Sequence, residues 1–272
     1  MTADGTGLGG GGGPAIPGNP DPGTVAVVGL GRLGAVLADR IGARFPVVLH
    51  DSDPGVARRI ASELVLPEVS SEELLIAADT VLLCVPPQET GKALTTLATT
   101  AQHLGRQPLF VNLATSVPTS DLPPVPAEVV GLKPVCQFTA VALGLRTVLV
   151  TASARRIGLL RTLAADLGEV VLGKEEVVGP ANRAATKAAL RACASLAAEL
   201  AGRGLPPDLV HAAISNVLVG TALDYPPADD NPYTSSVLAE LAAESDQAQR
   251  EAGEALGWAA WANRPATPGG PA

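Results

Sequence analysis

The chain has 272 residues, of which 47% are hydrophobic and 3% aromatic, and its formal net charge is −8. This length suits one large or two modest domains, with a core built mainly from Ala, Val and Leu. The acidic balance argues against a nucleic acid as partner, because phosphate binding needs a basic surface. No apolar run is long enough to span a membrane, and the N-terminus lacks the pattern of a signal peptide.

The cysteines indicate neither disulfides nor a metal site. Cys84, Cys136 and Cys193 lie far apart and form no C-x-x-C pair, and the chain has only three histidines. We therefore expect no zinc or other metal site. Isolated cysteines in apolar surroundings are typical of reduced proteins, so the sequence predicts a cytoplasmic location.

The most informative motif follows the apolar run Val25–Val28. A Gly29-x-Gly31-x-x-Gly34 pattern leads into a segment with helical spacing of apolar residues. Strand, glycine turn and helix in this order predict a dinucleotide site, in which the glycines permit the turn, the approach of a pyrophosphate and close packing of the helix. The alternative is a glycine turn in an α/β domain that binds nothing. The candidate cofactor-binding residues of this motif are Gly29, Leu30, Gly31, Arg32, Leu33 and Gly34.

Two aspartates follow the second predicted strand. Asp51 lies twenty residues after Gly31, where a carboxylate is placed to accept hydrogen bonds from the adenosine ribose. Because it would repel a 2′-phosphate, NAD is favoured over NADP, although Arg58 and Arg59 leave NADP open. Asp53 precedes Pro54 and is interpreted as a helix N-cap.

The remainder of residues 24–178 alternates between strand and helix patterns. Apolar runs predict strands over residues 47–49, 80–85, 109–113, 129–132, 147–151 and 170–172. This alternation predicts an α/β fold with a doubly wound, mostly parallel sheet. Ligands bind outside the carboxyl ends of such strands. The residues expected to shape the nicotinamide end of the site are Val85, Pro86, Pro87, Asn112 and Ala114.

The pattern changes at Gly179, where strand signals end. Residues 179–263 predict a small all-α domain with helices over 181–202, 206–223 and 237–262. Such a domain is small for independent stability, so we expect a homodimer formed through it; the alternative is docking on its own nucleotide-binding domain. Residues 1–23 and 264–272 predict disordered tails.

A basic stripe on the first of these helices is the candidate substrate site. Arg183, Lys187 and Arg191 are spaced four residues apart and share one helix face. They either form a solvated face or bind an anionic small-molecule substrate, with Lys187 as the proton donor. Lys133, after a strand end, is a second candidate; its alternative is an ordinary loop lysine before Pro134.

The order of the motifs resembles that of pyrroline-5-carboxylate reductases over about residues 24–223. The segments that carry this resemblance, after the glycine turn, are Val85-Pro86, Val130 to Pro134, Leu167-Gly168-Glu169-Val170, Gly179-Pro180-Ala181 and Gly220-Thr221-Ala222. The resemblance implies a Rossmann domain followed by a helical dimerisation domain. It also implies that NAD(P)H reduces a cyclic imine that bears a carboxylate.

The chain departs from this family near the expected substrate. The family has paired glycines among hydroxyl residues after the second helix, whereas residues 231–236 offer hydroxyls alone; Thr234 and Ser235 are therefore further candidates to donate a proton or anchor the substrate. A second resemblance, to β-hydroxyacid and 6-phosphogluconate dehydrogenases, implies a substrate-facing helix lysine, which Lys187 matches. The sequence predicts an NAD(P)-dependent oxidoreductase that acts on a C=N or C=O group. The alternatives are a β-hydroxyacid dehydrogenase-like enzyme and a nucleotide-binding regulatory protein without turnover.

Overall fold

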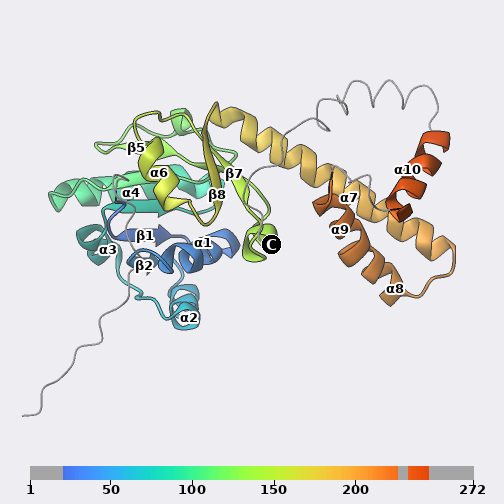
Figure 1. The fold of residues 1–272 in the computed structure, drawn as a ribbon. Coiled ribbons are helices and arrows are strands. Elements are labelled where there is room, and N and C mark those ends of the chain that lie inside the picture. Colours follow the sequence, from blue (N-terminus) through green and yellow to red (C-terminus); the bar gives the residue numbers. More distant parts are fainter. Residues whose placement is uncertain (1–20, 226–231, 245–272) are drawn as a thin grey trace, which may run out of the picture. The chain divides into compact units, whose positions relative to one another are not determined.

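The computed structural model describes residues 21–225 and 232–244 (Figure 1). Its contacts divide the chain into two compact units between Thr186 and Lys187. Residues 1–20 of the N-terminal tail predicted over 1–23, the tail predicted over 264–272, and the part of the third predicted helix beyond Glu244 lie outside the described residues. No membrane-spanning helix is found in the part of the chain that the structure describes.

A five-stranded parallel sheet forms the centre of the first unit. Its strands are β1 (Val25–Val28), β2 (Val47–His50), β3 (Thr80–Leu83), β4 (Leu109–Asn112) and β5 (Val129–Gly131). Their order is β2-β1-β3-β4-β5, and every neighbouring pair is parallel. The strand order therefore reverses between β1 and β3, which places a ligand crevice outside the carboxyl ends of these two strands.

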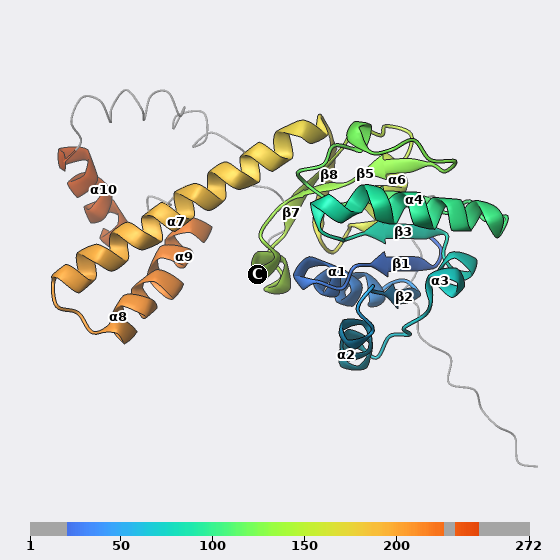
Figure 2. The ribbon, with the colours of Figure 1, turned by 180° about the vertical axis from the view of Figure 1, so that it is seen from behind.

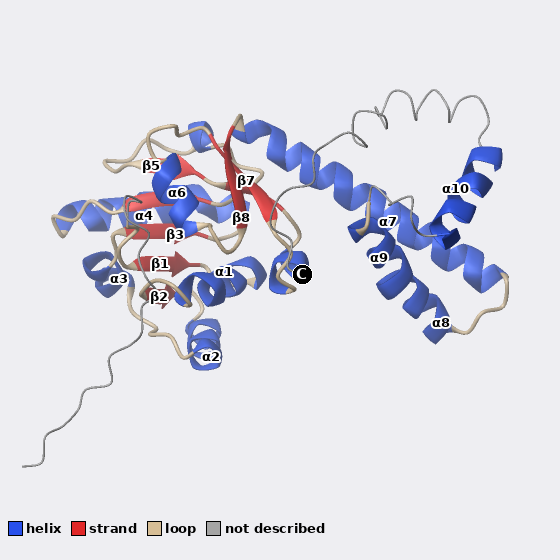
Figure 3. Cartoon of the chain, in the orientation of Figure 1, coloured by secondary structure: helices blue, strands red, loops and turns tan. Residues whose placement is uncertain are grey.

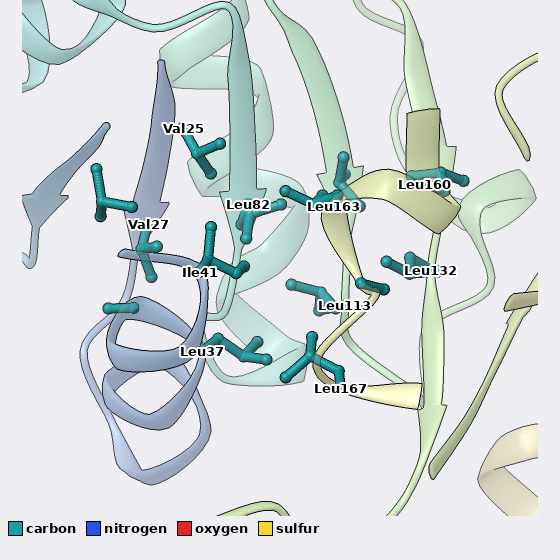
Figure 4. Packing of buried hydrophobic residues seen from close by; sticks show 14 of the residues in the cluster. Val25, Val27, Leu37, Ile41, Leu82, Leu113, Leu132, Leu160, Leu163 and Leu167 are labelled. Carbon is teal, nitrogen blue, oxygen red and sulfur yellow. The ribbon is translucent and has the colours of Figure 1, made fainter. Parts of the chain in front are cut away.

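Helices cover both faces of this sheet, as predicted for a doubly wound fold. The helices are α1 (Arg32–Gly42), α2 (Pro54–Leu64), α3 (Ser71–Ala77), α4 (Pro87–His103), α5 (Phe138–Ala142) and α6 (Ile157–Leu163). On one face, Leu37 and Ile41 of α1 pack with Val27, Leu82 and other core residues (Figure 4). The opposite face is covered by α3 and α4, of which α4 is prominent in Figure 2.

Side-chain caps explain where two of these helices begin. The Asp53 carboxylate accepts hydrogen bonds from the amides of Gly55 and Val56, with Pro54 in the first turn of α2, which confirms the predicted N-cap. Ser70 and Glu73 form a capping box at the start of α3. Both caps satisfy amides that a helix leaves without an intrahelical partner.

The later strands do not extend the first sheet. Instead β6 (Lys133–Val135), β7 (Thr147–Thr151) and β8 (Gly168–Leu172) form a separate sheet, with β6 antiparallel to β7 and β7 parallel to β8. The amide of Leu132 still bonds to the carbonyl of Asn112, but Pro134 has no amide hydrogen with which to continue a ladder. The chain therefore changes sheets at Leu132, and Lys133 lies in a strand rather than in the predicted loop.

Two short 3₁₀ helices complete the first unit. They are η1 (Thr119–Asp121), in the connection after β4, and η2 (Glu175–Val177), which leads directly into α7 (Val178–Gly202). The long helix α7 starts in the first unit and ends in the second.

The second unit is helical, as expected (Figure 3). After α7, the described helices are α8 (Pro207–Ala212), the π-helical segment η3 (Ala213–Leu218), α9 (Val219–Leu223) and α10 (Pro232–Glu244). The helix predicted to begin at Val237 begins five residues earlier, at Pro232, where the fixed φ of proline suits a first turn.

Candidate functional site

The glycine turn between β1 and α1 has the geometry that its sequence predicts. Gly29 has φ +90°, and a Cβ atom there would lie 2.9 Å from the carbonyl carbon of Cys84. A Cβ atom on Gly34 would lie 1.9 Å from the carbonyl oxygen of Gly29, whereas one on Gly31 would meet no atom within 4 Å. Gly29 and Gly34 thus make the tight turn possible, and the backbone of Gly31 stays open to a ligand.

The N-terminus of α1 faces this opening without a side-chain cap. Gly31 is the N-cap residue, and it makes no side-chain hydrogen bond to the first turn. The exposed Arg32 follows, with its guanidinium 5.2 Å from the centre of the Phe138 ring. Uncapped amides, the positive end of the helix dipole and a guanidinium are features that suit a phosphate group. Leu30, by contrast, is buried, and its amide donates to the carboxylate of Asp51.

Asp51 braces the same turn. One carboxylate oxygen accepts a hydrogen bond of 2.6 Å from the amide of Leu30, and the other accepts one of 2.9 Å from the amide of Asp53. Each oxygen keeps a second lone pair for another donor. Asp51 therefore stabilises the glycine turn, a role that the sequence did not indicate. Its carboxylate can still accept a hydrogen bond from a ribose hydroxyl.

A pocket of about 200 Å³ lies beside the glycine turn. It is formed by residues of α1, by the ends of β3 and β4, by α5 and by the first turns of α7. The lining residues are Leu33, Cys84, Val85, Pro87, Leu113, Ala114, Thr115, Pro134, Cys136, Phe138 and Asn182. Four predicted cofactor residues, from three separate segments, thus meet in one pocket.

Asn112 does not line the pocket, but it forms hydrogen bonds with the loop that does. It is fully buried, and its amide nitrogen donates to the carbonyl of Val117 at 2.9 Å and to the hydroxyl of Thr119 at 3.3 Å. Its oxygen accepts from the amide of Ala114 at 3.0 Å. Asn112 therefore shapes the loop that lines the pocket. Pro86 is the N-cap residue of α4, next to the lining residue Pro87.

The chemistry of the pocket is largely apolar. None of the described lining residues is charged at neutral pH. Burial raises the pKa of the Cys84 thiol to about 12, and burial also raises the pKa of Cys136, so both thiols stay neutral. Apolar walls with a few polar groups suit a flat, weakly polar ring such as nicotinamide.

Sequence reasoning missed several of these residues. The Asn182 side chain lines the pocket and donates a hydrogen bond of 3.0 Å to the carbonyl of Pro134. Phe138 and Cys136 also line it, and they belong to or precede α5, which was not predicted. The available signal was the position of Asn182 directly after Gly179-Pro180-Ala181, the segment at which the fold pattern changes.

The sequence offered two interpretations of Lys133, a candidate proton donor and an ordinary loop lysine, and the structure contradicts both. Its side chain is completely buried, and Nζ donates to the carbonyls of Ala114 and Val117, both at 2.9 Å. The third partner is Glu175, 3.6 Å away. Burial lowers the pKa of Lys133 to about 8, although Glu175 opposes the shift. A buried ammonium group that donates to two carbonyls and pairs with a carboxylate inside the protein is neither a loop lysine nor a proton donor to substrate.

None of the other candidate catalytic residues is among the residues that line this pocket. Arg183, Lys187 and Arg191 are all exposed on α7, as the solvated-face alternative expects. Thr234 and Ser235 lie in the first turn of α10, in the second unit. A catalytic role for Lys187, Thr234 or Ser235 stays a prediction.

A second, larger pocket of about 470 Å³ is a less suitable cofactor site. Glu128, Ser153 and Lys174 are among its lining residues, and none of the predicted site residues lines it. It is lined by all three residues of β5, an edge strand of the sheet, whereas ligands of such sheets bind where the strand order reverses, which here is between β1 and β3. The pocket beside the glycine turn is therefore the better candidate for the cofactor site, although the other pocket has the larger volume.

Comparison with known proteins supports the assignment of the fold. Residues 24–107 match the family described as NADP oxidoreductase coenzyme F420-dependent. The chain is similar to 1-pyrroline-5-carboxylate reductase from Streptococcus pyogenes, with 15% identity, coverage of 87% of this chain and 92% of that one, and a TM-score of 0.63. It is also similar to pyrroline carboxylate reductase from Plasmodium falciparum, whose structure has NADP bound, with 14% identity, 78% and 82% coverage, and a TM-score of 0.59.

An imine reductase from Streptomyces aurantiacus shares the fold as well, with 13% identity, 82% and 79% coverage, and a TM-score of 0.53. No curated protein sequence matches the chain. The predicted resemblance is thus confirmed for the Rossmann-type domain and for the α/β fold followed by long helices.

Proposed function

We propose that this chain is an NAD(P)H-dependent reductase that transfers hydride to the C=N or C=O carbon of an anionic small molecule, with a cyclic imino acid as the favoured substrate class. One observation carries the proposal. Leu33, in the first turn of α1, lines the same pocket as Val85, Pro87 and Ala114. The phosphate-binding turn and the apolar pocket are therefore contiguous, which is the arrangement a dinucleotide requires.

The residues fit the two halves of a dinucleotide in order. Asp51 accepts hydrogen bonds at the adenosine ribose, and the open backbone of Gly31 and the uncapped amides of α1 hold the pyrophosphate. Leu33, Val85 and their neighbours enclose the nicotinamide and exclude water. The cofactor supplies the hydride, so the protein needs to bind and orient both reactants.

NAD is favoured over NADP as the cofactor. The Asp51 carboxylate at the end of β2 would repel a 2′-phosphate. The two nearby arginines are used within α2, because Arg58 donates to the carbonyl of Pro54 at 3.0 Å and Arg59 pairs with Glu63 at 3.0 Å.

The proton donor is proposed to lie outside the pocket, because none of the described lining residues is an acid of suitable pKa. Lys187 is the first candidate, and Thr234 and Ser235 are alternatives that could instead anchor the substrate. A positively charged lysine also suits a substrate carboxylate.

A homodimer through the helical unit is part of the proposal. Large hydrophobic side chains of this unit are exposed in the single chain, among them Leu190, Leu209, Val217 and Leu223. No residue of α8, η3 or α9 is buried. Apolar surface of this kind favours association, which sedimentation equilibrium would detect as twice the monomer mass.

Two rival functions remain. A β-hydroxyacid dehydrogenase-like enzyme would use Lys187 in a similar position on C=O substrates. A nucleotide-binding regulatory protein is favoured by the absence of an acid among the described pocket residues.

The test combines binding and turnover. NADH and NADPH titrations of the wild-type chain should show binding, with NADH tighter. NADH oxidation should then be measured with cyclic imino acids, keto acids and β-keto acids. Turnover on imino acids supports the proposal, and turnover on β-keto acids alone supports the dehydrogenase. Tight NADH binding with no turnover on any substrate favours the regulatory protein.

A further inference from the structure

The loop that follows β4 is held from behind by a buried cation. Residues 113–115 of this loop line the pocket. Nζ of Lys133 donates to the carbonyls of Ala114 and Val117 on the other side of the wall, both at 2.9 Å. Hydrogen bonds from a charged donor are stronger than neutral ones, so this contact fixes the path of the loop.

Glu175 holds the far end of the same loop. One oxygen of its carboxylate accepts from the amide of Thr119 at 2.9 Å and from its hydroxyl at 2.8 Å, and lies 3.6 Å from Nζ of Lys133. A Cβ atom on Gly131 would lie 2.0 Å from the other oxygen. The glycine in β5 thus leaves the space that the carboxylate fills.

The loop is also fixed on the side of α7. Glu175 belongs to η2, which leads directly into this helix. A Cβ atom on Gly179, in the first turn of α7, would lie 2.9 Å from the carbonyl oxygen of Thr115. The loop therefore lies between the buried pair and the start of the helix that carries Asn182.

We propose that Lys133 and Glu175 are positioning residues for the nicotinamide half of the cofactor: the pair fixes the loop of residues 113–119 that forms one wall of the pocket. This inference rests on the proposed function. Neither residue lines the pocket in which the nicotinamide is placed, so the pair acts through the loop and not on the reacting atoms.

The energetics argue against a purely structural role. Burying two charges carries a desolvation penalty, and apolar residues of similar volume often replace a buried pair without loss of stability. Placed behind a binding wall, however, Lys133 gives two loop carbonyls a charged donor in addition to the neutral one that each already has, from the amide of Val117 or from Asn112. We therefore expect the pair to determine the geometry of the loop rather than to increase the stability of the fold.

The test separates the two halves of the cofactor. ADP-ribose has the adenosine and both phosphates but no nicotinamide, so it engages the glycine turn and Asp51 alone. We expect Lys133→Met to weaken NADH binding by about tenfold or more, the size expected for lost hydrogen bonds to a charged group. ADP-ribose binding should remain within about twofold. Glu175→Gln should show the same selective loss to a smaller degree.

Neighbouring residues provide matched controls. Lys174 and Glu176 flank Glu175 in the sequence and are exposed. Lys174→Met and Glu176→Gln remove the same kinds of charge from exposed positions, and both should bind NADH and ADP-ribose as the wild type does. Thermal unfolding of each variant establishes that it is folded, and Glu175→Gln carries the test if Lys133→Met does not fold.

Two outcomes in the variants would overturn the inference alone, and one outcome in the wild type would overturn it together with the proposed function. Folded variants that lose NADH and ADP-ribose affinity equally would show a general structural role, and variants that lose neither would show no role. A wild-type chain that binds neither ligand would overturn the proposed function and this inference with it. Wild-type binding of both ligands, with no selective loss in the variants, would overturn the inference alone.

Discussion

The backbone of Gly34 packs so closely on Gly29 that a Cβ atom at position 34 would lie 1.9 Å from the carbonyl oxygen of Gly29. The obstacle is backbone rather than a flexible side chain, so Gly34→Ala must push α1 away from the turn. We expect a loss of about 3 kcal/mol in the free energy of unfolding, as for other overpacked sites. Urea denaturation of the variant measures it. An unchanged midpoint would show that the helix does not pack as described.

Gly31→Ala should leave stability almost unchanged and impair cofactor binding. No atom lies within 4 Å of the position its Cβ would take, and φ is −64°, so the free energy of unfolding should change by less than about 1 kcal/mol. The added methyl group would occupy the approach of the pyrophosphate. We expect NADH affinity to fall by at least about tenfold, measured by fluorescence titration. Wild-type affinity in this variant would contradict the proposed phosphate site.

Asp51→Ala should weaken NADH more than NADPH. The carboxylate is proposed to bind the ribose hydroxyls of NADH and to repel the 2′-phosphate of NADPH. Its loss therefore removes an attraction to NADH and a repulsion of NADPH. Because Asp51 also accepts from the amide of Leu30, Asp51→Asn is the matched variant that keeps an acceptor but not the charge. Parallel titrations with both cofactors measure the ratio. Equal losses for NADH and NADPH would sink the ribose assignment.

Asp53 provides the stability control for this experiment. Its carboxylate caps α2 through the amides of Gly55 and Val56, and it is not proposed to touch the cofactor. Asp53→Ala should cost about 1 kcal/mol of folding free energy and leave the preference for NADH over NADPH unchanged. A change in that preference would mean that Asp53, and not Asp51 alone, reaches the ribose.

The parts of the fold that depend on local patterns were predictable from the sequence. The strand at Val25–Val28, the glycine turn and the helix that follows it are consistent with apolar spacing and with backbone conformations that glycine permits. The Asp53 cap follows from a short-range hydrogen bond in the same way. Local chemistry of this kind depends on few distant contacts, so it can be recognised in one sequence.

The parts that depend on distant contacts were not predictable. Lys133 before a proline looks like a loop lysine, and only the fold brings Glu175 and the carbonyls of Ala114 and Val117 around it. Asn182 enters the pocket because the start of α7 packs beside β6, a strand that local patterns did not reveal. The residues missed at the candidate site are those placed by tertiary pairing rather than by their own segment.

The buried lysine also predicts how stability changes with pH. Burial lowers the pKa of Lys133 from 10.5 to about 8. Below pH 8 the group is charged in both the folded and unfolded states, and the full cost of burying the charge is present. Between about pH 8 and 10.5 the unfolded chain binds more protons than the folded one, so this group makes the free energy of unfolding rise with pH.

Comparison with Lys133→Met isolates this contribution. The free energy of unfolding of the wild type, minus that of the variant, should increase between about pH 8 and 10.5 and approach a gain of about 3 kcal/mol at the upper end of this range. Urea denaturation at a series of pH values measures the difference, and Lys174→Met, which removes an exposed lysine, is the control. A difference that stays constant would show that Lys133 keeps its ordinary pKa, and a difference that falls would show that Glu175 stabilises the charged form more than burial disfavours it.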